Sequence, residues 1–131
     1  MAVKLQIDHL TKRYSLQREA RQVLALHDIT LGVEDGEFMA VVGPSGCGKT
    51  SLMNIVAGLL PYEQGSVLID GKKVEGPGTD RAVVFQHASL LPWRSTLNNV
   101  AFSLEAGDMP RSERLQRARA ALQLVGLDGF E

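Results

Sequence analysis

The clearest chemistry in the sequence lies in one short glycine-rich segment. It reads Gly43-Pro44-Ser45-Gly46-Cys47-Gly48-Lys49-Thr50, which fits the pattern G-x-x-x-x-G-K-[ST] of a phosphate-binding loop. Glycine allows tight turns in which successive backbone N–H groups converge on phosphate oxygens. In this pattern the lysine reaches the outer phosphates and the threonine hydroxyl ligates Mg²⁺. We therefore predict that these eight residues and Ser51 bind a nucleotide, with Thr50 holding the metal.

The elements on both sides of this loop support the same prediction. Phe38–Val42 is apolar throughout, as expected of a central strand that is covered on both faces. Downstream, apolar residues between Leu52 and Val56 recur at helical spacing, and Gly58 with Pro61 supplies a stop signal. This order of strand, loop and helix argues against the alternative of a glycine-rich turn without a ligand. Cys47 has no neighbouring base for thiol chemistry, so we interpret it as a small filler residue.

Further strands are predicted on either side of this unit. Alternation of apolar and polar residues predicts half-buried antiparallel strands at Val3–Asp8 and Ile29–Glu34. The polar stretch from Ser15 to Gln22 is expected to be a loop between them. Two more short strands are predicted at Gly65–Gly71 and Ala82–Phe85. The chain is therefore expected to combine an antiparallel opening with one apolar central strand and two short strands.

A helix is predicted near the C-terminal end of the sequence. Pro110 is suited to open it, and Gly126 is placed to end it. One apolar face is expected from Leu115, Ala118, Leu122 and Val125.

Composition and charge exclude several classes of protein. The 131 residues are 44% hydrophobic and 22% charged, as in one globular domain. No run approaches the roughly 18 apolar residues of a bilayer-spanning helix, and the N-terminus is neither a signal peptide nor an anchor, so we expect a cytoplasmic protein. A net charge of -1, with 14 basic and 15 acidic residues, argues against nucleic acid as a partner. The single cysteine excludes an internal disulfide and a cysteine-based zinc site.

From Lys12 to Glu105 the sequence resembles the nucleotide-binding subunits of ATP-binding-cassette (ABC) transporters, most closely importers of taurine, alkanesulfonates or nitrate. Thr11-Lys-Arg-Tyr14 resembles the A-loop of that family, and GPSGCGKT is its form of the phosphate loop. Val83-Val-Phe-Gln86 resembles the strand that ends in the Q-loop glutamine. The resemblance implies an α/β phosphate-loop fold with an antiparallel β subdomain and part of a RecA-like core. It also implies ATP and Mg²⁺ as cofactors.

The resemblance also implies roles for individual residues. The Tyr14 ring would stack on adenine, although a strand-end aromatic that packs on the core edge is an alternative. Gln86 would contact Mg²⁺ or the attacking water and link the site to a membrane subunit. Lys49 and Gln86 would then be the catalytic residues, and Thr50 and Gln86 the metal ligands.

A surface around Leu90, Leu91 and Trp93 is the expected contact with a transmembrane permease subunit, because it places apolar side chains in an exposed loop. The alternative is that these side chains fold back over the core. Residues 1–131 would form one partial ABC domain, with its helical subdomain beginning at about residue 94. In the family a second ATP-binding subunit completes a homodimer, and the protein is peripheral on the inner face of the plasma membrane.

Residues that split water onto the terminal phosphate are missing from the sequence. The family places an LSGGQ-type signature, an apolar strand ending in Asp-Glu (Walker B) and a switch histidine further along the chain, so we expect this chain to bind nucleotide without hydrolysing it. Val67-Leu-Ile-Asp70 superficially resembles the Asp-Glu strand, but Gly71 follows, so we predict a hairpin instead. Two alternative functions remain: a non-catalytic module that docks on a membrane subunit, and a stand-alone phosphate-loop kinase or GTPase.

Overall fold

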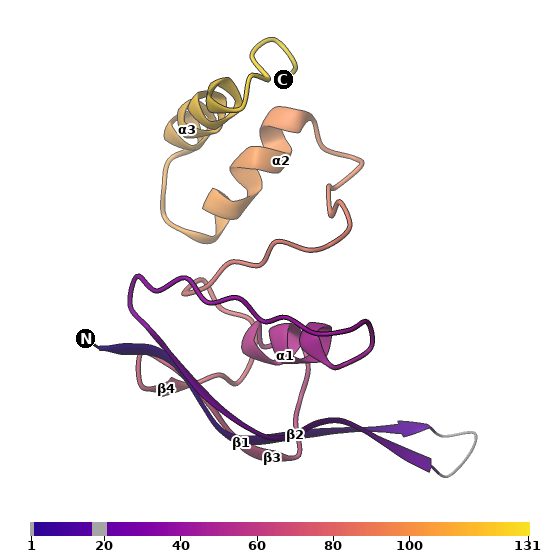
Figure 1. Cartoon of the computed structure of the whole chain (residues 1–131). Helices are drawn as coiled ribbons and strands as arrows, with labels where there is room; N and C mark the ends of the chain where they lie inside the picture. The colour runs from indigo at the N-terminus through magenta and orange to yellow at the C-terminus, as the bar shows by residue number, and fades with distance from the viewer. Residues whose placement is uncertain (1, 17–20) are drawn as a thin grey trace. The chain divides into compact units, whose positions relative to one another are not determined.

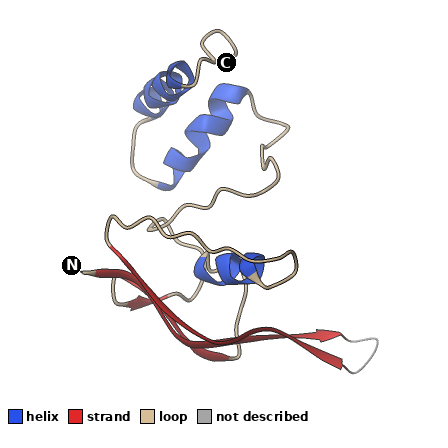
Figure 2. Ribbon diagram, in the orientation of Figure 1, coloured by secondary structure: helices blue, strands red, loops and turns tan. Residues whose placement is uncertain are grey.

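The computed structural model describes residues 2–16 and 21–131, which form two compact units. The first extends to Val83 and the second begins at Val84. An antiparallel sheet and one helix make up the regular structure of the first unit, and the second contains two α-helices (Figures 1 and 2). The phosphate loop therefore belongs to the first unit, and the predicted partner surface to the second.

The sheet of the first unit is antiparallel throughout. Its strands are β1 (Val3–Leu16), β2 (Arg21–Glu34), β3 (Gln64–Ile69) and β4 (Lys72–Lys73), in the spatial order β2-β1-β3-β4. The predicted antiparallel opening is confirmed, but both strands are longer than the alternation indicated.

The predicted loop from Ser15 to Gln22 is therefore wrong at its ends. Ser15 pairs with Gln22 and Leu16 with Arg21, so all four are strand residues. The rest of that predicted loop lies outside the described residues.

The predicted hairpin at Val67–Asp70 is confirmed. β3 and β4 are joined by Asp70 and Gly71, both with positive φ, of 49° and 73°. Two such residues form the tight turn that matches the twist of an antiparallel pair. Asp70 is thus a turn residue, and its side chain pairs with Lys4 at 2.7 Å.

The core of the first unit forms between the sheet and helix α1 (Lys49–Val56), which covers one face of it (Figure 1). Leu52 and Ile55 are buried on α1, three residues apart and therefore on one side of the helix. They belong to one cluster with strand residues Ile7, Leu10, Leu26, Val67 and Ile69. Burial of each large side chain contributes about 1.5–3 kcal/mol, so this cluster fixes α1 on the sheet. The predicted helix and its stop at Gly58, where φ is 77°, are confirmed.

A bulge crosses the sheet and changes the direction in which β1 side chains point. Ile7 and Leu10 are three residues apart, which would place them on opposite faces of a regular strand, yet both are buried. His9 (φ 48°) and Asp28 (φ 51°) have left-handed backbone, and the register shifts next to them. Gly65 on β3 (φ 94°) lies against the same bulge, because a Cβ there would lie 2.5 Å from the His9 carbonyl oxygen. Simple alternation could not reveal this shift.

The predicted central strand and one of the predicted short strands are not strands. Phe38–Val42 and Ala82–Phe85 have no regular secondary structure, and the side chains of Phe38 and Val84 are 94% and 98% exposed. A strand is held by hydrogen bonds to neighbouring strands. Among residues 2–16 and 21–131 no strand pairs with either segment, so both are irregular connections.

The second unit has its own small core. Helix α2 (Thr96–Phe102), the short 3-10 helix η1 (Ser103–Ala106) and helix α3 (Arg111–Leu124) follow one another. Leu97 and Ala101 of α2 pack against Ala118 and Leu122 of α3.

The helix predicted from Pro110 to Gly126 is confirmed, with Pro110 as N-cap and Gly126 at φ 75°. Val125 was expected on its apolar face but is exposed, because it is the residue after the last helical turn. α2 was not predicted. Its sequence signal is Ser95, whose hydroxyl accepts a hydrogen bond from the Asn98 N–H as a helix cap.

Replacement of Gly58 by alanine tests how closely the chain covers the end of α1. A Cβ at this position would lie 2.1 Å from the Gly76 carbonyl oxygen, and left-handed backbone alone costs a residue with Cβ roughly 1–2 kcal/mol. Gly58→Ala should therefore destabilise the first unit by about 2 kcal/mol or more. The matched control is Gly71→Ala, since Gly71 also has positive φ but has nothing within 4 Å of its Cβ position. Hydrogen exchange at the Ile55 amide measures the stability of the first unit in both variants. An equal loss of stability in the two variants would contradict the close contact at Gly58.

The ion pair across the bulge gives a pH-dependent signal. His9 Nδ1 and Asp28 Oδ1 are 2.6 Å apart, and the hydrogen bond and charge of Asp28 raise the pKa of His9 above 6.5. The pair therefore stabilises the fold fully below about pH 6.5 and loses its effect as pH rises through the higher pKa of the folded state. NMR titration of the His9 ring should show the raised pKa, and Asp28→Asn should lower it. An unchanged His9 titration in that variant would contradict the pairing.

Candidate functional site

The phosphate loop lies close to β2 where it enters α1, and a glycine makes this close approach possible. Gly48 is the N-cap of α1 with φ 100° and ψ 4°. A Cβ at this position would lie 2.6 Å from the Ala25 carbonyl oxygen and 2.9 Å from Leu26 Cδ2. Only glycine fits both the backbone conformation and the space. No side chain caps α1 at its N-terminus, so the backbone N–H groups of its first turn are available to a ligand.

The Lys49 ammonium points into its own loop. It donates hydrogen bonds to the carbonyl oxygens of Gly43 (2.6 Å) and Pro44 (2.8 Å) and lies 3.4 Å from Cys47 Sγ. This places a full positive charge beside the N-terminus of α1, which carries partial positive charge of its own. The two together favour an anion at this position. The arrangement brings four of the predicted phosphate-binding residues, Gly43, Pro44, Cys47 and Lys49, together.

Tyr14 lies beside the first turn of α1, although it is 37 residues away from it in sequence. Its hydroxyl is 2.8 Å from Ser51 Oγ, and its ring is partly exposed. The Lys12 ammonium lies 5.2 Å from the ring centroid, within cation–π range. The structure thus brings two predicted binding residues, Tyr14 and Ser51, together. Stacking of the ring on a base stays a prediction.

An ion pair that sequence reasoning missed holds the end of β1 on which Tyr14 lies. Lys12 Nζ donates to Glu63 Oε1 at 3.0 Å, and the Arg13 N–H donates to Glu63 Oε2 at 2.6 Å. The Lys12 side chain is only 7% exposed, and that of Glu63 is 41% exposed. Burial opposes ionisation of Glu63, but the Arg13 and Lys12 hydrogen bonds outweigh it and lower the pKa of Glu63. Since the partners are about 50 residues apart, no local pattern marks them.

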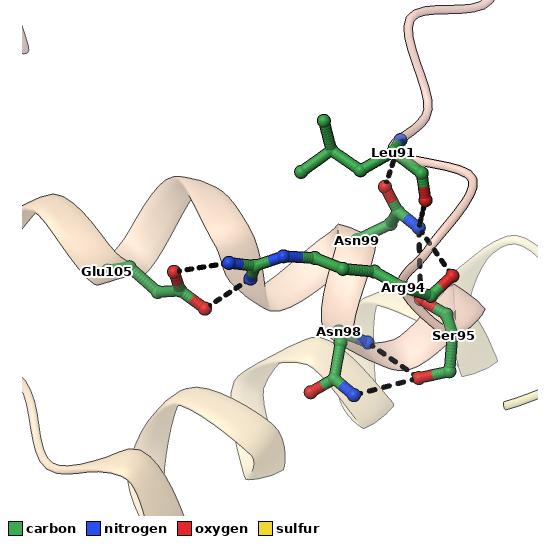
Figure 3. Close-up of polar contacts among 6 residues, drawn as sticks. All are labelled: Leu91, Arg94, Ser95, Asn98, Asn99 and Glu105. Carbon is green, nitrogen blue, oxygen red and sulfur yellow. Dashed lines mark hydrogen bonds and ion pairs between the residues drawn. The ribbon is translucent and has the colours of Figure 1, made fainter.

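The predicted residues that lie beyond the phosphate loop and its helix belong to the second unit. Gln86 is an exposed bend residue. Leu90 and Trp93 are exposed, Trp93 by 77%, which agrees with a surface position and not with the alternative of folding back over the core. Leu91 is half-buried and is anchored by Asn99, which donates to its carbonyl oxygen at 3.1 Å and accepts from its N–H at 2.8 Å (Figure 3).

No group of three or more histidine, cysteine, aspartate or glutamate residues is gathered as a metal site in residues 2–16 and 21–131. No helix within those ranges has the length and apolar character needed to cross a membrane.

A glycine loop that leads into a helix with an uncapped first turn, packed on a sheet, is the arrangement of a phosphate-binding-loop protein. The chain belongs to the ABC transporter family, whose sequence profile it matches over residues 26–131. The matched region takes in the phosphate loop and the whole second unit, whereas Tyr14 precedes it. The family resemblance and the fold class predicted from the sequence are confirmed.

Curated relatives match nearly the whole chain. It is 50% identical over 131 residues to an uncharacterized ABC transporter ATP-binding protein of Methanocaldococcus jannaschii, and 48% identical over 127 residues to the taurine import ATP-binding protein TauB of Escherichia coli (strain K12). The alignments cover 100% and 97% of this chain and 48% of each relative, so the chain spans about half the length of the curated relatives it matches. A solved dimeric ATP-binding cassette, in a post-hydrolysis state with ADP and Pi, superposes with a TM-score of 0.81 at 30% identity, over 95% of this chain and 58% of that one.

Proposed function

We propose that this chain binds the phosphates of ATP in the loop from Gly43 to Thr50. The observation that carries the proposal is the Lys49 ammonium, held within the loop beside the uncapped N-terminus of α1. Together they offer a charged donor and several backbone donors to one anion. A stand-alone kinase or GTPase would share this loop, but the membership in the ABC transporter family favours a transport protein.

Residues from other segments would make the remaining contacts to the nucleotide. Tyr14 would stack on the adenine from the end of β1, and the Thr50 hydroxyl and Gln86 would ligate Mg²⁺. Bound Mg²⁺ would neutralise charge on the outer phosphates. Thr50 is exposed in the first turn of α1, where its hydroxyl is accessible to a metal ion.

The wider protein is proposed to be the energy-coupling subunit of an importer for a small anion such as taurine, an alkanesulfonate or nitrate. Similarity to the taurine import ATP-binding protein TauB supports this solute class. A permease subunit would dock on the surface around Leu90, Leu91 and Trp93, which directly precedes a helical subdomain that begins at about residue 94. The protein would be peripheral on the inner face of the plasma membrane. It would also pair with a second ATP-binding subunit, as the similar solved cassette is dimeric.

We further propose that the 131 residues bind ATP without hydrolysing it. Hydrolysis requires a positioned water molecule and groups that stabilise charge in the transition state. The printed sequence contains no signature of the LSGGQ type and no apolar strand ending in Asp-Glu. Gln86 and Lys49 alone would leave the water without a base.

Lys49→Ala tests the phosphate contact. Loss of a hydrogen bond to a charged group costs about 1.5–3 kcal/mol, so affinity for a fluorescent ATP analogue should fall roughly tenfold or more. Lys72→Ala is the matched control, because Lys72 is an exposed lysine of the same unit that lies outside the site. Phosphate release should stay at background for the wild type and both variants. Equal affinities for wild type and Lys49→Ala would sink the proposal, and turnover above background would overturn the claim of binding alone.

Alkylation of Cys47 gives an independent test of where the nucleotide lies. Cys47 is exposed and is the single cysteine of the chain, so one mass shift by mass spectrometry reports on this loop alone. Bound ATP with Mg²⁺ should slow its reaction with iodoacetamide, because phosphates would cover the loop. In Lys49→Ala, the ratio of the alkylation rates with and without ATP should approach one. Wild-type rates that are equal with and without ATP would contradict the placement.

A further inference from the structure

A cavity with an excess of positive charge lies in the second unit, beside the predicted partner surface. Its volume is about 580 Å³, and its lining includes Trp93, Arg94, Glu105, Arg111, Arg114 and Leu115. Three guanidinium groups thus face one carboxylate.

Arg94 and Glu105 form an ion pair with each other. The guanidinium group donates to both carboxylate oxygens, at 2.6 and 3.2 Å (Figure 3). It also lies 4.9 Å from the centroid of the Phe102 ring. The Arg94 hydrogen bond, with Arg114 and Arg111 at longer range, lowers the pKa of Glu105. Glu105 therefore stays ionised and is engaged with Arg94.

Arg111 and Arg114 are left for another anion. Within residues 2–16 and 21–131 neither guanidinium has a hydrogen-bond or ion-pair partner. By contrast, Arg117 on the same helix pairs with Glu113 at 2.8 Å. The cavity therefore carries two positive charges more than its own carboxylate neutralises.

Apolar groups next to these charges favour a protein partner over a free ion. Trp93 is 77% exposed at the cavity, and Leu115 forms part of its wall. Arg94 also lines a second, apolar hollow of about 490 Å³ with Leu90, Leu91 and Val125. A small ion would leave this apolar surface uncovered and would stay screened by water. A docked segment would bury the apolar side chains and strengthen the charge interaction by excluding water.

We propose that this cavity binds an aspartate or glutamate side chain of an acidic peptide segment in a partner protein, with Arg111 and Arg114 as the ligands of the carboxylate and Trp93 covering the adjacent apolar side chains. The inference rests on the proposed docking of a partner at this surface and adds the chemistry that the partner must present.

Selection from a phage-displayed peptide library against the full chain tests the proposal. The enriched peptides should carry an acidic residue beside apolar ones, and the acidic preference should disappear when the target is the double variant Arg111→Gln, Arg114→Gln. An enriched peptide, labelled with fluorescein, should bind this variant at least tenfold more weakly by anisotropy. Arg117→Gln removes the same charge outside the cavity and should bind as the wild type does. Replacement of the acidic residue of the peptide by its amide should weaken binding to the wild type by a similar factor.

Several results would overturn the proposal. These are the absence of any enriched peptide, enrichment without an acidic preference, and an acidic preference that the double variant retains. Full competition by 1 mM inorganic phosphate, or arginine-dependent binding to phosphatidylglycerol vesicles, would instead assign the cavity to a small anion or a lipid surface. ATP-analogue binding by the same variants separates this inference from the proposed function: if the analogue binds and the peptides do not, only the docking inference fails.

Discussion

Burial of Leu52 and Ile55 against the sheet is the interaction on which the candidate site depends. It fixes the axis of α1 over β1 and β3, and the first residue of α1 is also the lysine of the phosphate loop. Within the loop the Cys47 N–H donates to the Pro44 carbonyl oxygen at 3.3 Å, and the rest of its shape depends on where α1 begins and on its contact with β2. Gly48 is the point of that contact, since the neighbouring Ala25 carbonyl leaves no space for a side chain. A loss of packing beneath α1 would therefore also disorder the phosphate loop.

A second set of contacts places Tyr14 at this site. The bulge around His9 changes the face of the sheet to which the following β1 side chains point. Beyond the bulge, Thr11 and Lys12 are buried. Glu63 then holds Lys12 and the Arg13 backbone. The strand end is thus fixed by groups of opposite charge, one of them almost fully enclosed. Such a pair contributes to position more than to net stability, because desolvation of Lys12 offsets much of the attraction.

The sequence indicated features whose cause is local and missed those that depend on distant partners. The glycine loop, the helix from Lys49 and the turn at Asp70-Gly71 follow from conformational preferences of adjacent residues, and all three were predictable. The strands expected at Phe38–Val42 and Ala82–Phe85 were not correct, because apolar character alone does not supply a hydrogen-bonding neighbour. The Lys12–Glu63 pair joins residues 51 positions apart, and the bulge needs three strands at once. Tyr14 and Gln86 were found only through the family resemblance.

The position of the Lys49 side chain has a consequence for selectivity. Its ammonium is held by two carbonyl oxygens of the same loop, so the loop contains an internal competitor for any incoming group. A ligand gains from this lysine only if its oxygen attracts the ammonium more strongly than a neutral carbonyl does, as an anionic oxygen does through its full charge. The exchange would therefore be favourable for phosphate oxygens and nearly neutral for hydroxyl or carbonyl groups. A loop that binds its ligand in this way would select for negative charge.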